Sequence, residues 1–140
     1  MTQIHAYVGF NGRCREAMNF YKENIGGELN LQTVEGSPME AQCPESMKGQ
    51  ILHATLIKDG TLLLMGSDMT APGEKPVGSN IALSLSCSSE EEINRLFTKL
   101  SGEGNVIDPI KKQFWGALFG VCKDKYGTTW MFNYDMNSKN

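Results

Sequence analysis

The sequence lacks several features that would each indicate a particular function. Its 140 residues contain only two histidines, and its four cysteines include no pair spaced as CxxC, so it carries no zinc-ribbon or thioredoxin-like motif. No apolar run approaches the roughly 20 residues that a membrane span needs. No signal-peptide pattern opens the chain, because polar residues interrupt its first positions. We therefore expect a cytoplasmic protein with no membrane partner.

Positive charge is also scarce. The 13 lysines and arginines are outnumbered by 16 aspartates and glutamates, which gives a formal net charge of −3. The basic residues are scattered apart from the pair Lys111 and Lys112. Binding to a phosphate backbone needs a clustered basic surface, so we expect no nucleic-acid partner.

Motifs for the commoner catalytic devices are missing as well. The sequence contains no GxSxG elbow, no HExxH pair and no phosphate-binding glycine loop. Its hydrophobic content of 40% and charged content of 21% nevertheless suit a folded chain. The length predicts one compact domain or two closely joined halves.

What the sequence does contain is an internal repeat. Residues 53–68 (HATLIKDGTLLLMGSD) and 119–135 (FGVCKDKYGTTWMFNYD) each join two apolar runs through a Lys-Asp turn with a glycine. Each is preceded by a strand-like run, an amphipathic helix and another strand. The order strand, helix, strand, strand, strand therefore occurs twice, at 1–69 and 80–140, around a Pro/Gly-rich linker at 70–79. Few helices and many hairpins indicate an α+β fold rather than a parallel α/β fold.

Local signals place the elements within each half. A helix over 13–25 is expected to be capped by Asn11, and a second helix is expected between a Ser89–Glu92 capping box and Gly102. A strand is expected to end at Pro109. The segment 36–50 has no periodicity and is either a binding lid or a surface excursion.

The strand at 80–87 predicts a cavity. One of its faces carries large side chains, which should pack on the helices. The other carries Asn80, Ala82, Ser84 and Ser86, and such small side chains leave volume that must be filled or remain open. Bulky residues could fill that volume, and the candidates are Met65, Phe114, Trp115, Trp130 and Met131. Otherwise these same residues line a pocket for a small organic molecule.

Four segments together resemble a known family. They are YVGFNGRCREAMNFYKENIGGEL, LLLMGSD, NIALSLSC and KKQFWGALFGVCKDKYGTTWMFN. The chain resembles the PhnB-like branch of the vicinal oxygen chelate superfamily, which includes glyoxalase I, bleomycin resistance proteins and dioxygenases. The resemblance implies two βαβββ modules that form a U-shaped, mostly antiparallel sheet around a cavity. It also implies a homodimer, in which the modules pair either within one chain or across the dimer.

The resemblance further implies a divalent metal held by His or Glu on four strands, but the matching positions differ here. The fifth-strand ligand falls on Asn80, and the eighth-strand ligand falls on Met131. The fourth-strand ligand falls near Leu64 or Met65, and the first-strand ligand falls near Ala6. Hard and borderline divalent ions prefer carboxylate, imidazole or water as ligands. We therefore expect no cofactor and no metal centre.

Two functions follow as alternatives, and whether the chain is an enzyme stays open. The first is a metal-independent binding protein for a small organic ligand. Its pocket would be lined by Tyr7, His53, Met65, Asn80, Trp115, Trp130 and Met131. The second is a glyoxalase-type lyase, isomerase or dioxygenase, whose Zn, Ni or Mn would be held by His5, His53 and a carboxylate that the sequence does not identify. In a variant of this second function without a metal, His53 is the candidate catalytic base.

Two smaller expectations concern acids and thiols. Asp68 lies at a predicted strand end and is expected to be solvated. Cys87 and Cys122 fall inside strands and should be buried, whereas Cys43 lies in the 36–50 segment and is the candidate reactive thiol.

Overall fold

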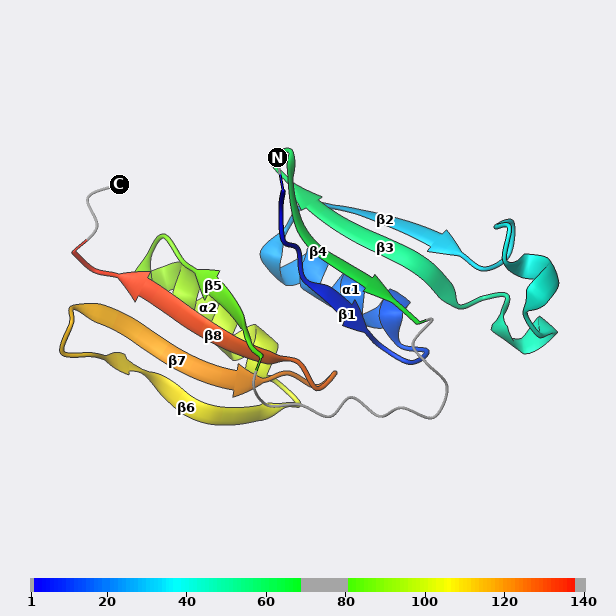
Figure 1. The fold of residues 1–140 in the computed structure, drawn as a ribbon. Coiled ribbons are helices and arrows are strands. Elements are labelled where there is room, and N and C mark those ends of the chain that lie inside the picture. Colours follow the sequence, from blue (N-terminus) through cyan, green and yellow to red (C-terminus); the bar gives the residue numbers. More distant parts are fainter. Residues whose placement is uncertain (1, 69–80, 138–140) are drawn as a thin grey trace. The chain divides into compact units, whose positions relative to one another are not determined.

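A computed structural model describes residues 2–68 and 81–137 (Figure 1). The chain divides into two compact units, Met1–Pro76 and Val77–Asn140. The linker expected at 70–79 lies outside the described residues. Neither α-helix of the described part is long and apolar enough to cross a membrane.

The first unit is a βαβββ module. Its elements are β1 (Tyr7–Gly9), α1 (Cys14–Ile25), β2 (Glu28–Thr33), β3 (Ile51–Lys58) and β4 (Thr61–Ser67). The strands form one sheet in the order β1-β4-β3-β2, in which only the β1–β4 pair is parallel. The segment between β2 and β3 contains two short 3-10 helices, Glu40–Gln42 and Glu45–Met47.

The second unit repeats this plan. Its elements are β5 (Leu83–Ser86), α2 (Glu90–Ser101), β6 (Asn105–Lys112), β7 (Ala117–Lys123) and β8 (Thr129–Asp135). Its sheet has the order β5-β8-β7-β6, again with one parallel pair, β5–β8. The predicted α+β class and the duplicated βαβββ module are therefore confirmed. β4 is an inner strand of the first sheet, and β8 is the equivalent inner strand of the second sheet.

Each helix covers one face of its own sheet (Figure 1). One face of α1 is fully buried, and its residues recur at spacings of three and four: Cys14, Ala17, Met18 and Tyr21. Gly66 of β4 lies beneath them, because a Cβ there would meet Phe10, Cys14 and Met18 at 2.8–3.3 Å. In α2 the buried residues are Ile93, Leu96 and Leu100, and Phe97 makes an edge contact with Phe132 of β8.

The N-terminus of α1 is capped by a residue from a distant strand, and the expectation that Asn11 caps it is wrong. The residue before the helix is Arg13, and its side chain makes no capping bond. Asp68, which follows β4, instead accepts hydrogen bonds through Oδ1 from the backbone N–H groups of Gly12 and Cys14, at 2.7 and 2.8 Å. Its Oδ2 accepts from the N–H of Ile51 at 2.9 Å.

Asp68 is only 6% exposed, so the expectation that it is solvated is also wrong. Its carboxylate joins the start of α1, the start of β3 and the end of β4. An anionic acceptor suits this position, because the first N–H groups of a helix have no partner within the helix.

Two other local predictions are confirmed, and one differs from the structure. Ser89 Oγ accepts from the Glu92 N–H at 3.0 Å, which confirms the cap of α2. Asp59 and Gly60 have φ values of 52° and 78°, as a tight hairpin turn requires. The strand expected to end at Pro109 continues to Lys112, because β6 is an edge strand whose register shifts between Asp108 and Lys111. A proline is tolerated at such an edge or bulge.

Candidate functional site

The face of the first sheet that α1 leaves uncovered carries several of the predicted site residues. Strand pairing places Tyr7, Met65 and Thr55 side by side across β1, β4 and β3. Their neighbours Ala54 and Gly66 point to the helix side, since successive strand residues alternate between faces. We call this surface the first helix-free face, and its residues are Tyr7, Asn30, Gln32, His53, Thr55 and Met65.

His53 and Tyr7 form an aromatic pair on this face. Their ring centroids lie 5.8 Å apart with an interplanar angle of 32°. Tyr7 is 55% exposed, and His53 and Met65 are half-buried. The structure therefore brings together Tyr7, His53 and Met65, three residues expected from the sequence. Gln32, opposite His53, and Asn30, opposite Thr55, add amide groups that the sequence analysis did not select.

The second sheet has a comparable surface on the side away from α2. Ser84, Met131 and Val121 lie side by side across β5, β8 and β7, and Ser86, Asn133 and Phe119 form the next row. We call these six residues the second helix-free face. Leu83 and Leu85 alternate with the serines and pair with Trp130 and Phe132 on the helix side. The predicted division of this strand into a large face and a small polar face is thus observed for residues 83–86.

A methionine occupies the same place in both sheets. Met65 lies in β4 between β1 and β3, and Met131 lies in β8 between β5 and β7. Both side chains are half-buried. A thioether is polarizable and adaptable, which suits contact with aromatic groups. It is not among the carboxylate, imidazole and thiolate ligands that structural and catalytic zinc sites use, nor among the oxygen ligands of magnesium and calcium.

Trp130 lies in the core of the second unit rather than on its helix-free face. It is only 3% exposed, and its Nε1 donates a hydrogen bond of 2.8 Å to Asp124 Oδ2. Asp124 Oδ1 accepts from the N–H groups of Tyr126 and Thr128, so this carboxylate shapes the β7–β8 turn. Adjacent residues of a strand point to opposite faces, and Trp130 and Met131 therefore cannot share one.

Trp115 belongs to an exposed aromatic group in the turn between β6 and β7. It is 51% exposed and makes edge contacts with Phe114 and Phe119, at centroid distances of 5.0 and 6.3 Å. The contact with Phe119 puts Trp115 at the border of the second helix-free face. Phe114 is 97% exposed, so it does not fill the core of its unit.

The remaining predicted site and metal residues do not assemble a ligand set. Asn80 lies outside the described residues. His5 is exposed, with Nε2 3.1 Å from Gln3 Oε1, and His53 packs against Tyr7. Within residues 2–68 and 81–137, no group of three or more His, Cys, Asp or Glu side chains could hold a metal ion.

Three of the four cysteines are buried, as expected for Cys87 and Cys122. Burial, with a smaller contribution from the nearby Asp68 carboxylate, raises the pKa of the Cys14 thiol to about 12. Burial likewise raises the pKa of Cys87 and of Cys122 to about 11, with contributions from Glu92 and Asp124 respectively. Cys43 is half-buried.

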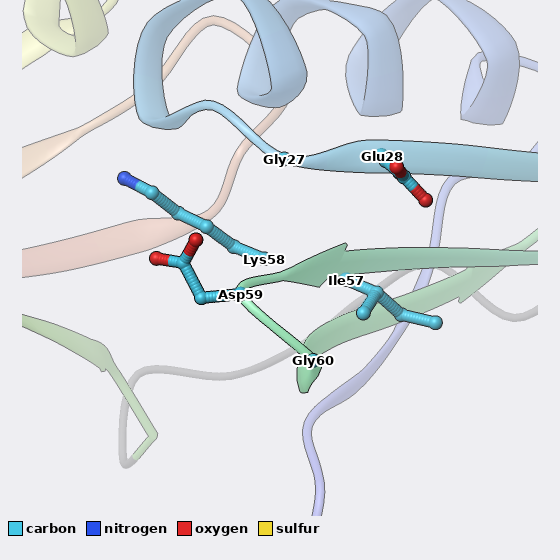
Figure 2. Close-up of a pocket in the computed structure, with 6 residues that line it drawn as sticks. All are labelled: Gly27, Glu28, Ile57, Lys58, Asp59 and Gly60. Atoms are coloured by element: carbon cyan, nitrogen blue, oxygen red, sulfur yellow. The ribbon is translucent and has the colours of Figure 1, made fainter.

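A surface pocket of about 510 Å³ lies where β2 begins and where β3 turns into β4. It is lined by Gly27, Glu28, Ile57, Lys58, Asp59 and Gly60. Figure 2 shows that the charged ends of Glu28, Lys58 and Asp59 do not converge on a common point. The Lys58 ammonium already donates a 2.8 Å hydrogen bond to the carbonyl of Ile25, at the C-terminus of α1. No residue selected from the sequence lines this pocket.

Comparison with known proteins agrees with this architecture. The sequence model of the Glyoxalase/Bleomycin resistance protein/Dioxygenase superfamily matches residues 3–132. Protein YjdN of Escherichia coli strain K12 is 32% identical in an alignment of 139 positions, and the alignment covers 93% of each chain. The crystal structure of protein PA1353 from Pseudomonas aeruginosa is 36% identical, with a TM-score of 0.83 over 96% of this chain and 98% of that one.

A further solved structure is similar over nearly the whole chain. It is the PhnB protein of Bacillus cereus, described as a putative 3-demethylubiquinone-9 3-methyltransferase. It is 25% identical, with a TM-score of 0.74 over 95% of this chain and 99% of that one. The duplicated βαβββ plan, the match across 3–132 and these relatives agree: the chain belongs to the glyoxalase/bleomycin resistance protein/dioxygenase superfamily.

Proposed function

We propose that this protein binds a small organic molecule against its helix-free faces, and that it does so without the divalent metal of its superfamily. The observation that carries the proposal is the pair of half-buried methionines, Met65 and Met131, at the same position of the two sheets. The superfamily's fourth-strand and eighth-strand metal ligands fall at or next to these positions. Thioethers there favour dispersion contact with a ligand over coordination of a cation.

The groups beside the two methionines support the same proposal. On the first helix-free face, Met65 is flanked by the Tyr7–His53 ring pair, which offers a surface for stacking. On the second helix-free face, Met131 is flanked by Ser84, while Phe119 and Asn133 lie in the next row. An apolar centre with a few hydrogen-bonding groups around it is the usual lining of a small-molecule site.

The methyltransferase description of the Bacillus cereus protein has no support in this sequence. A transferred methyl group would require a methyl-donating cofactor, and this sequence has no glycine-rich loop after a strand to bind a nucleotide-like cofactor. Binding is therefore the function that the side chains support best.

Methionine methyl NMR tests the proposal directly. The protein is labelled at the methionine methyl groups, assigned by Met→Leu substitution, and titrated with a panel of one-ring and two-ring aromatic alcohols, carboxylates and amines. We expect members of the panel to shift the Met65 or Met131 methyl signal saturably. Met18 lies on the buried face of α1 and serves as an internal control that should not move.

A matched pair of variants completes this test. Met65→Leu keeps an apolar side chain of similar volume and should change the affinity less than about threefold. Met65→Glu places a carboxylate against the ligand and should weaken binding at least about tenfold, because a charge would lose water without gaining a partner. If no panel member moves either methyl signal at millimolar concentration, the proposed function is wrong.

A further inference from the structure

The charge distribution on the helix-free faces restricts which molecules they can bind. On the first face the row Tyr7, Met65, Thr55 and Asn30 crosses all four strands and contains no formal charge. In the next row Gln32 lies opposite His53. A charged side chain, Glu28, appears only at the start of β2, opposite Ile57.

The second face shows the same restriction. Its two rows across β5, β8 and β7 contain two serines, Met131, Asn133, Val121 and Phe119, and none carries a charge. Charged residues lie at the margins of these rows. Lys123 ends β7 and Asp135 ends β8, and on the edge strand β6 Asp108 pairs with Val121 and Lys111 pairs with Phe119. Asp108 and Lys111 form an ion pair of 3.6 Å with each other, so their charges offset locally.

Apart from the imidazole of His53, the polar groups on both faces are hydroxyls and amides. Hydroxyls come from Tyr7, Thr55, Ser84 and Ser86, and amides come from Asn30, Gln32 and Asn133. Each of these groups can donate and accept a hydrogen bond. They suit a ligand with hydroxyl or carbonyl groups on a flat apolar body. A carboxylate, phosphate or ammonium group would lose its water here without meeting an opposite charge, and that loss is costly.

Building on the proposed function, we propose that the ligand is an uncharged aromatic molecule bearing hydroxyl or carbonyl groups, and that the helix-free faces discriminate against its ionised analogues. The discrimination arises because none of the six residues that define each face carries a fixed formal charge. A single compensating charge introduced into the first row should therefore alter it.

Three probes of similar size and shape but different charge test this inference. Naphthalene-2-methanol, 2-naphthoate and 2-naphthylmethylammonium share one ring system and one attached carbon. Each is titrated into the full-length protein, and the dissociation constant is taken from the Met65 and Met131 methyl shifts. We expect the alcohol to bind at least about tenfold more tightly than either ion. An ion that binds as tightly as the alcohol overturns the inference but leaves the proposed function standing.

A charge-introducing variant separates electrostatics from shape. In Thr55→Lys a cation stands beside Met65 in the first row. In this variant the affinities for the alcohol and for naphthoate should become more similar, and the affinities for the alcohol and for the ammonium probe should become more different. Unchanged affinity ratios would show that charge is not what the site selects. If none of the three probes moves Met65 or Met131 in the unmodified protein, the inference fails, whereas the proposed function fails only if the whole panel also leaves both methyl signals unmoved.

Discussion

Replacing Asp68 should destabilise the first module more than any surface acid could. In Asp68→Ala, the N–H groups of Cys14 and Ile51 lose their acceptor in a buried site, and the N–H of Gly12 loses its acceptor in a half-buried one. An orphaned buried N–H costs roughly 1–3 kcal/mol. Loss of a helix N-cap costs about 1 kcal/mol. The free energy of unfolding should therefore fall by about 4 kcal/mol.

Urea unfolding followed by far-UV circular dichroism measures this loss. Fluorescence is unsuitable, because both tryptophans, Trp115 and Trp130, lie in the second unit. With an m-value of about 1–3 kcal/mol/M, the midpoint for the first unit should drop by about 2 M. Asp68→Asn keeps one acceptor oxygen and should lose about half as much stability.

The chain provides a matched control for this experiment. Asp135 ends β8 and is exposed, with Oδ1 accepting only the exposed N–H of Asn137 at 2.9 Å. Asp135→Ala should cost less than about 1 kcal/mol, as surface substitutions usually do. If Asp68→Ala is no more destabilising than Asp135→Ala, the capping role assigned to Asp68 is wrong.

Three further predictions concern the cores and the thiols. Gly66→Ala should destabilise the protein by about 1–3 kcal/mol, because its Cβ would lie 2.8 Å from Phe10, whereas Gly49→Ala, with nothing within 4 Å, should be near neutral in the same urea assay. Trp130→Phe should lower the free energy of unfolding by about 1–3 kcal/mol, because the hydrogen bond to Asp124 is lost. The affinity for the ligand, measured from the Met131 methyl signal, should stay unchanged. Weakened binding with intact stability would contradict this prediction. Ellman's reagent at pH 8 should modify Cys43 alone in the native protein. Cys14, Cys87 and Cys122 should react only after unfolding, because their raised pKa values leave almost no thiolate at that pH. Peptide mass spectrometry identifies the modified sites, and labelling of Cys87 in the native protein would contradict the prediction.

The sequence was a good guide wherever the information is local. The period-two alternation of Leu83 and Leu85 with Ser84 and Ser86 predicted which side chains face the helix, and the structure has that arrangement. The Asp59-Gly60 hairpin and the Ser89 cap also depend on residues a few positions apart. In each case neighbouring backbone geometry decides the outcome.

The sequence failed where partners are distant along the chain. Asp68 bonds to Cys14 across 54 positions, and no local pattern distinguishes it from a solvated acid at the end of a strand. The different roles of Trp130 and Met131 were predictable in principle, because adjacent strand residues point to opposite faces. Applying that alternation outward from Met131 would also have selected Asn133, which the sequence analysis missed.

The number of metal ions bound per chain most directly tests the claim that this member of the superfamily binds its ligand without a cation. The purified full-length protein is dialysed to equilibrium against Ni²⁺, Zn²⁺ and Mn²⁺ in turn, in slight excess over protein, and then analysed by plasma mass spectrometry. A Met65→Glu/Met131→Glu double variant restores carboxylates beside the superfamily's ligand positions and serves as a comparison. We predict far less than one ion per chain in the unmodified protein, and stoichiometric binding of any of the three ions would contradict the proposal.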